Sequence, residues 1–338
     1  MSKRRRKGSG GGHGADGGDG PQSRGAAARP RARDPRAIEG THAATQRILR
    51  TRGFKSIEEV NEFLRAQRML TDYAPIEAAT ALEAAQDLMY KAFQEVGRKR
   101  VRLARRALAT CAECADAYVV LSEETARTLD EALGLCEAGA AAGERALGRA
   151  WIEAHAGDLW MHLEARPYMR SLRGLASCLW EMDRKGESIS RYQEMLRLNR
   201  NDNQGARYVL ICHLIDEGRD AEASRLLAAF RGEGTAWWAF SRALLAFRFA
   251  GATRTSNMHL GRAMRANPYV VMLLLDVVPV PPEMPRTWRV GEPDEAVLYF
   301  RDAHEGWSAT EGALEWLEDR MHRLSPPRGP GHGATPRP

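Results

Sequence analysis

Large apolar side chains recur three and four positions apart through most of this chain, a spacing that places them on one face of an α-helix. The helical stretches come in pairs separated by short polar breaks. The clearest pairs span 168–182 with 185–198, 203–217 with 220–230, and 236–250 with 254–266. We find no sustained alternation of apolar and polar residues, which a sheet would require. The pattern therefore predicts an all-α protein.

The three clearest pairs share one pattern. Small residues Ser188, Ala223 and Ser256 occupy equivalent positions 35 and 33 residues apart, and a large side chain follows each of them four residues later. Paired helices with a period of about 34 residues are typical of tetratricopeptide repeats, which stack into an α-solenoid. With the looser pairs nearer the N-terminus, we expect about five helix pairs.

The pattern divides the chain into five regions. They are a basic Gly-rich tail (1–37), a helical region with degenerate repeats (38–166), the regular repeats (167–268), a capping region (269–324) and a second tail (325–338). Both tails are poor in large apolar side chains, so we expect them to be disordered. The capping region is expected to cover the apolar face of the last repeat.

The charge of the chain is concentrated in the first tail. Residues 1–37 hold ten Lys or Arg and three Asp, a net charge of +7, which leaves −1 of the total +6 for the other residues. The run Lys3–Lys7 is the kind of patch that contacts nucleic acid or directs nuclear import. The alternative is an arm that only improves solubility.

Other features indicate the cell compartment. The chain has no apolar run of the length of a membrane span and no apolar stretch after its charged start, which a secretory signal would need. Its five cysteines are an odd number at irregular spacing, unlike a disulfide framework. We therefore expect a cytoplasmic protein without a membrane span.

Candidate chemistry is sparse. Cys111 and Cys114 form a single CxxC without the further ligands that zinc needs. His155 and His162 share a helical face in the irregular segment 151–166, with acidic residues nearby. Signatures of phosphate-binding loops, serine hydrolases and zinc proteases are missing. We expect no cofactor, no metal and no catalysis, and an enzyme site at 151–166 is only a third alternative.

In tetratricopeptide repeats the first helix of each pair lines a concave groove. Counting from the shared small residue predicts seven partner-binding side chains: Arg170, Arg173, Ser177, Trp180, Tyr208, Trp238 and Arg248. The same count also places on the groove side Glu181, Cys212, Ile215, Asp216, Ser241, Leu245 and Phe249. Guanidinium groups bind carboxylates bidentately and stack on rings, which suits an extended peptide. The alternative is that the aromatic side chains pack between helices and the arginines are solvated surface.

Several runs resemble a known family more specifically. They are Ala165-Arg166-Pro167-Tyr168-Met169-Arg170, Asn201-Asp202-Asn203-Gln204-Gly205 and Gly312-Ala313-Leu314-Glu315-Trp316. Over roughly residues 160–317 the chain resembles bacterial tetratricopeptide proteins related to the suppression-of-tumorigenicity-7 family. The resemblance implies an all-α repeat fold that binds proteins, and it implies no catalytic residues.

The sequence thus predicts a protein–protein interaction scaffold that holds a partner peptide or helix in a groove. The alternative is a nucleic-acid-associated adaptor that acts through the basic tail. Partner identity, pathway and oligomeric state are not specified by the sequence.

Overall fold

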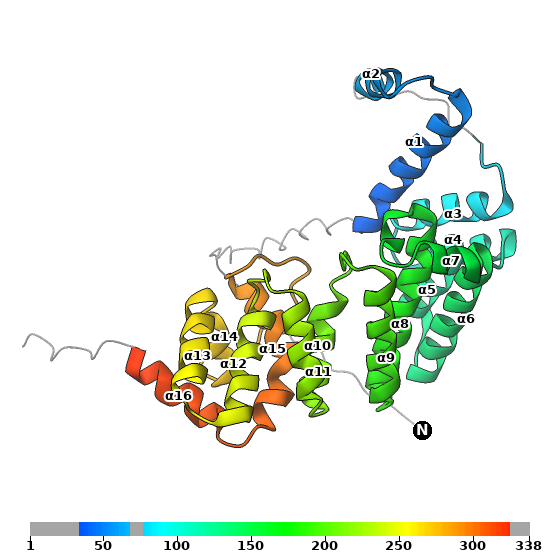
Figure 1. Ribbon diagram of the computed structural model, residues 1–338. Coiled ribbons are helices and arrows are strands. Elements are labelled where there is room, and N and C mark those ends of the chain that lie inside the picture. The colour runs from blue at the N-terminus through cyan, green and yellow to red at the C-terminus, as the bar shows by residue number, and fades with distance from the viewer. Residues whose placement is uncertain (1–33, 68–76, 325–338) are drawn as a thin grey trace, which may run out of the picture. The chain divides into compact units, whose positions relative to one another are not determined.

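A computed structural model describes residues 34–67 and 77–324, and this part of the chain is all-helical (Figure 1). It contains sixteen α-helices, three 3-10 helices and no strand. The predicted tails lie outside the described residues except for positions 34–37. There Pro35–Ile38 form a 3-10 turn, so described structure starts slightly before the predicted boundary.

The elements follow one another in this order: η1 (Pro35–Ile38), α1 (Glu39–Arg52), α2 (Ile57–Gln67), α3 (Ala81–Ala92), α4 (Gly97–Thr110), α5 (Ala115–Thr125), α6 (Leu129–Leu147), α7 (Arg149–Ala154), η2 (Leu159–Met161), η3 (Leu163–Ala165), α8 (Arg166–Glu181), α9 (Lys185–Leu198), α10 (Ala206–Asp216), α11 (Asp220–Ala229), α12 (Ala236–Ala250), α13 (Arg254–Ala266), α14 (Tyr269–Leu274), α15 (Pro293–Ser308) and α16 (Ala313–Leu324). The three clearest predicted pairs correspond to α8 with α9, α10 with α11, and α12 with α13.

Helices that are neighbours in sequence pack together in pairs: α3 with α4, α5 with α6, α8 with α9, α10 with α11, and α12 with α13. Below, the first helices are α3, α5, α8, α10 and α12, and the second helices are α4, α6, α9, α11 and α13. The second helices of the first four pairs also pack against the first helix of the following pair. The buried apolar side chains form three clusters among the described residues, and the largest of them extends from α7 to α16.

The small residue shared by the clearest pairs lies where the two helices of a pair are closest. Ser188 is fully buried on α9, and its hydroxyl donates to the carbonyl oxygen of Ala176 on α8 at 2.7 Å. Ala223 and Ser256 are equally buried in the next two pairs. A large side chain at these positions would separate the helices, which explains why the pattern places only small residues there.

The polar breaks between helices have the conformations that the sequence predicts. Gly218 and Gly251 end α10 and α12 with positive φ angles of 65° and 68°, which glycine adopts without steric cost. In the Asn201–Asn203 run it is Asp202 that caps α10. Its two carboxylate oxygens accept from the backbone N–H groups of Ala206 and Arg207 at 2.7 and 2.9 Å.

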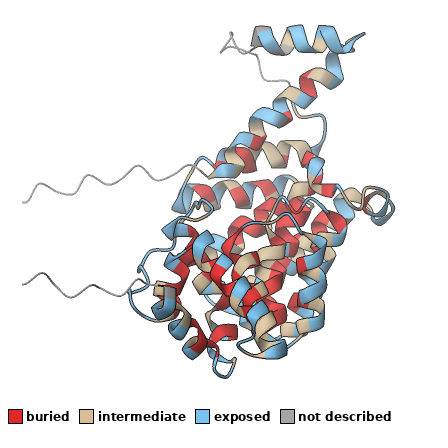
Figure 2. Ribbon diagram, turned by 60° about the vertical axis from the view of Figure 1, so that its left-hand side comes forward, coloured by how far each residue is buried: buried red, intermediate tan, exposed pale blue. Residues whose placement is uncertain are grey.

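Burial is highest where the helices pack on one another (Figure 2). The helix α12 is apolar around almost its whole circumference, which is typical of a helix covered on several sides. None of the helices in residues 34–67 and 77–324 combines the length and the apolar character that crossing a membrane needs.

Candidate partner-binding surface

The predicted groove side of the first helices is largely covered by other segments of the same chain. α15 packs against the first helices α10 and α12, and also against α14. Figure 1 shows it between these helices. The capping region therefore does more than cover the last repeat, because α15 lies along two consecutive first helices.

α15 meets α10 at a glycine. A Cβ atom added to Gly306 would lie 2.7 Å from Oδ1 of Asp216 and 2.9 Å from Cγ2 of Ile215, so only glycine permits this approach. Arg248 of α12 joins the same contact, since its guanidinium donates to the carbonyl oxygens of Ile215 and Gly306 at 2.7 and 3.1 Å. Arg248 was predicted to bind a partner, and here it ties α15 to α10 and α12.

The contact between α15 and α12 is both polar and aromatic. The indole Nε1 of Trp237 donates to Oδ2 of Asp302 at 3.1 Å, and the backbone N–H of Ala236 donates to Glu295 at 2.8 Å. Tyr299 and Trp307 of α15 are fully buried. Buried apolar surface of this kind contributes strongly to holding one helix on another.

Two carboxyl groups at this contact are perturbed. The pKa of Asp216 is raised to about 7, mainly by burial and also by the nearby carboxylate of Glu305. Oδ1 of Asp216 has no hydrogen-bond partner among the described residues. Burial also raises the pKa of Asp302, although Arg301 opposes the rise. The contact between α10 and α15 therefore contains a carboxyl group that titrates near neutral pH.

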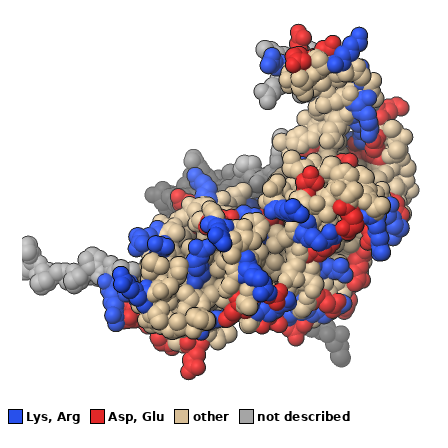
Figure 3. Space-filling view, in the orientation of Figure 1, with Lys and Arg blue, Asp and Glu red and all other residues tan. Residues whose placement is uncertain are grey.

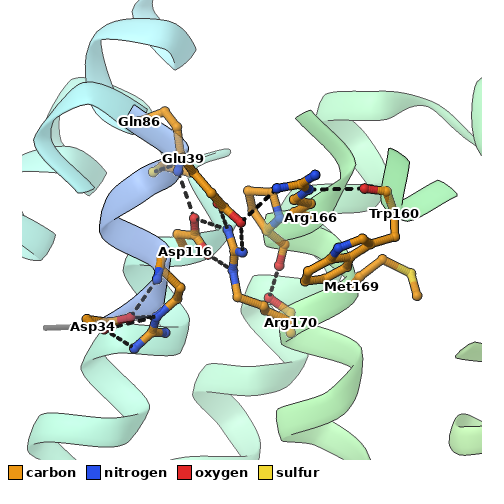
Figure 4. Close-up of polar contacts among 12 residues, drawn as sticks. Asp34, Glu39, Gln86, Asp116, Trp160, Arg166, Met169 and Arg170 are labelled. Atoms are coloured by element: carbon orange, nitrogen blue, oxygen red, sulfur yellow. Dashed lines mark hydrogen bonds and ion pairs between the residues drawn. The ribbon is translucent and has the colours of Figure 1, made fainter. Parts of the chain in front are cut away.

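The N-terminal part of the chain reaches the same side of the first helices through a buried ion network (Figure 4). The guanidinium of Arg170 on α8 binds both carboxylate oxygens of Glu39 on α1 at 3.0 Å. It also binds both oxygens of Asp116 on α5 at 2.7 Å. Gln86 of α3 donates to the same Asp116 carboxylate, and Arg166 donates to Glu39. Four helices and two carboxylates thus meet around one guanidinium.

This network corrects the prediction for Arg170. Its side chain is 9% exposed, and although burial disfavours its charge, the ion pairs with Asp116 and Glu39 hold its pKa above the ordinary value. The hydrogen bonds of its guanidinium go to two carboxylates of the same chain, those of Glu39 and Asp116. Arg170 is therefore a structural residue and not a surface anchor for a partner.

Trp238 also differs from the prediction. It is 1% exposed and its ring packs edge-on against Phe230 of α11. The neighbouring Trp237 faces α15 instead. Successive helical residues point about 100° apart, so a difference of one position moves an indole from one face of α12 to another. Trp238 is a core residue.

Tyr208 and Trp180 are half-buried and already have partners. The Tyr208 hydroxyl donates to Glu233 at 3.0 Å, and its ring packs against Trp237 at 5.1 Å between centroids. The Trp180 ring stacks on the imidazole of His213 with 3.3 Å between the ring centroids, and the ammonium of Lys185 lies 4.1 Å from the centroid of the Trp180 ring. Both residues fit the alternative prediction, in which aromatic side chains pack between helices, better than the prediction of side chains that face an open groove.

Arg173 and Ser177 remain accessible. Both are exposed on α8, one helical turn apart, and Trp180 follows in the next turn. The Arg173 guanidinium donates to the carbonyl oxygen of Gln204, which leaves other N–H groups of the guanidinium for a ligand. We name this stretch of Arg173, Ser177 and Trp180 the α8 surface. It lies on the first helix α8, which binds α1 through Arg170 and precedes α10 and α12, the first helices that contact α15.

The other candidate residues are placed as follows. Cys114 is buried, and burial raises the pKa of its thiol to about 12, so it is a poor nucleophile at neutral pH. The imidazole rings of His155 and His162 do meet, at 4.5 Å between centroids, and Trp151 stacks on His155. The described residues contain no group of three or more His, Cys, Asp or Glu side chains that could hold a metal ion.

Sequence reasoning missed the residues that dock α15, above all Trp237, Asp302 and Gly306. One signal was available: α12 carries large apolar residues on every side, more than a helix exposed along a groove would have. Glu39 had no such signal, since it lies where the repeats are degenerate.

No known protein-family model matches this chain, and none of the curated proteins gives a significant match. The resemblance to the suppression-of-tumorigenicity-7 family therefore stays a prediction.

Proposed function

We propose that this protein is a non-catalytic, cytoplasmic scaffold of the tetratricopeptide type that binds a partner helix or extended peptide on its first helices. The pairing of sequence-adjacent helices and the small residues 35 and 33 residues apart support the repeat assignment. Repeat proteins of this kind use such a face for recognition.

The observation that carries the proposal is the position of α15. A helix of 16 residues packs along α10 and α12 through one close backbone approach, two buried aromatic side chains and a Trp–Asp hydrogen bond. These are the elements of helix-in-groove recognition. The side of the first helices that contacts α15 is thus suited to bind a helix. In this chain α15 itself occupies that side on α10 and α12.

The α8 surface is the part of that side left for a second molecule. Arg173 offers guanidinium N–H groups, Ser177 a hydroxyl and Trp180 a half-buried indole. Arg and Trp are the residues that most often anchor protein interfaces. We expect a ligand that places a carboxylate on Arg173 and an apolar side chain beside Trp180.

Affinity capture with the full chain tests this proposal. Arg173→Glu is expected to lose partners that the wild type retains, because it reverses the charge of the one charged residue of the α8 surface. Arg105→Glu is the matched control, since Arg105 is exposed on the second helix α4. If the two variants retain the same proteins as the wild type, the α8 surface is not the binding site.

The second candidate function, a nucleic-acid-associated adaptor, is favoured by the +7 charge of residues 1–37 against −1 for the remainder. Removing residues 1–33 separates the two candidates. Loss of binding to nucleic acid with no change in partner capture would give the tail its own function. Loss of partner capture alone would contradict a partner site on α8.

A further inference from the structure

The chain has a further cleft, which shares Arg248 with the contacts of α15. It has a volume of about 950 Å³ and lies between the second helix α11 and the pair α12 and α13. Its apolar lining includes Leu227 and Leu245, which are 6% and 8% exposed, and Phe249, which is 92% exposed. Leu245 and Phe249 were predicted to face the groove, and the structure places them in this cleft.

The rim of the cleft is basic. Arg231, Arg242 and His259 line it, and among the described residues neither Arg242 nor His259 has an ion-pair or hydrogen-bond partner. The only acidic residue in the lining, Asp220, is bound by Arg248 at 2.9 Å. The unpaired charge of the cleft is therefore positive.

The surrounding sequence reinforces this charge. Residues 234–275 contain five arginines and no Asp or Glu, in a chain that has 44 acidic residues. The pKa of His259 is lowered by burial and then by Arg242 and Arg262, which indicates that these two guanidinium groups lie near the imidazole. Blue side chains are visible over the helices α12 and α13 on the left of Figure 3. Of the three arginines that line the cleft, only Arg248 is balanced by a carboxylate, that of Asp220.

We propose that this cleft, which we name the α11–α12 cleft, is a second interaction surface that binds an acidic segment of a partner protein through carboxylates on Arg231 and Arg242 and an apolar side chain against Phe249. Its volume is in the range of sites that enclose a few side chains. An exposed phenylalanine beside unpaired arginines is a typical interface anchor.

The chain's own outlying segments do not suit this cleft. Residues 1–33 carry nine Lys or Arg against two Asp, and residues 325–338 carry two Arg and no acidic residue. Both segments would be repelled by Arg231 and Arg242. A nucleic-acid backbone would satisfy the arginines but not the apolar floor of Leu227 and Leu245, so an acidic protein segment fits better.

Fluorescence anisotropy with the full chain tests the proposal. The probe is a labelled synthetic peptide in which glutamates flank leucine and phenylalanine, and the comparison peptide has glutamine in place of every glutamate. We expect the acidic peptide to bind, Arg242→Glu to weaken binding at least about tenfold, and Phe249→Ala to weaken it several-fold. Raising the salt concentration should weaken binding as well.

The control variants separate this surface from the rest of the molecule. Arg102→Glu and Arg105→Glu, both at exposed positions of α4, should leave the affinity for the acidic peptide within about twofold of the wild type. Because Phe249 is exposed and Arg242 has no partner within the described residues, their substitutions should leave the circular dichroism spectrum unchanged.

Four results would overturn the proposal. They are failure of the wild type to bind the acidic peptide, equal binding of the glutamine peptide, an equal effect of Arg105→Glu and Arg242→Glu, and preferential binding of a single-stranded oligonucleotide that Arg242→Glu abolishes. The last result would assign the cleft to nucleic acid.

Discussion

The guanidinium of Arg170 lies 3.0 Å from both carboxylate oxygens of Glu39, although 131 residues separate the two in the chain. The same guanidinium binds Asp116, so one buried cation joins α1 and α5 to α8. The first helices are therefore held to the N-terminal segment by charge, and to the C-terminal segment by the packing of α15.

Removing this cation should be costly. We expect Arg170→Met to lower the free energy of unfolding by about 3–5 kcal/mol, because it leaves two buried carboxylates without their counter-ion. Urea denaturation followed by circular dichroism measures the change. Arg173→Met, three residues along the same helix and exposed, should change it by less than about 0.5 kcal/mol. Equal effects of the two substitutions would show that the network does not stabilise the fold.

The docking of α15 should require a residue without a side chain at position 306. Gly306→Ala places a methyl group 2.7 Å from Asp216, so we expect a loss of about 1–3 kcal/mol and faster hydrogen exchange in α15. Gly134→Ala is the control, since its Cβ would meet nothing within 4 Å in the helix α6. That substitution should stabilise the protein by about 0.4–1 kcal/mol. A stabilising effect of Gly306→Ala would contradict the close approach.

The stability of the protein should depend on pH through Asp216. Its pKa is about 7 in the folded protein, against an ordinary value of 3.8. Between about pH 4 and pH 7 the folded protein holds a proton that the unfolded chain has lost, so the free energy of unfolding falls as the pH rises. Asp216→Asn should remove this contribution and flatten the profile in that window. Parallel profiles of wild type and variant would mean that Asp216 titrates normally.

The requirement for small residues at the repeat positions can be tested within one helix. Ser188→Leu should destabilise by about 1–3 kcal/mol, because the site is fully buried and 2.7 Å from the backbone of α8. Ser190→Leu, on the exposed side of α9, should stay within about 0.5 kcal/mol of the wild type. Thermal or urea denaturation distinguishes them, and similar losses would argue against close packing at the repeat position.

The repeat pairs could be predicted because their determinants are local. Apolar spacing, a glycine such as Gly218 after a helix and a small residue such as Ser188 all act within a few turns of the chain. The three clearest pairs therefore agree with the observed helices to within a few residues.

The site could not be predicted as well, because it depends on contacts between distant segments. α15 has no counterpart in the repeat period, so nothing local indicates that it packs on α10 and α12. Arg170 is enclosed by Glu39 and Asp116, and both carboxylates belong to a region without clear repeats. The choice between Trp237 and Trp238 depends on the rotation of α12, which α15 and Phe230 determine together.

The most direct test of the account is site-specific photo-crosslinking from the α8 surface. A photoreactive phenylalanine derivative is placed at Ser177 in one protein and at Ser190, exposed on α9, in another, and each is irradiated in cells of the source organism. If the α8 surface binds a partner, we expect a discrete crosslinked product from position 177, lost when Arg173→Glu is added, and none from position 190. The same products from both positions, or a product from 177 that survives Arg173→Glu, would contradict the account.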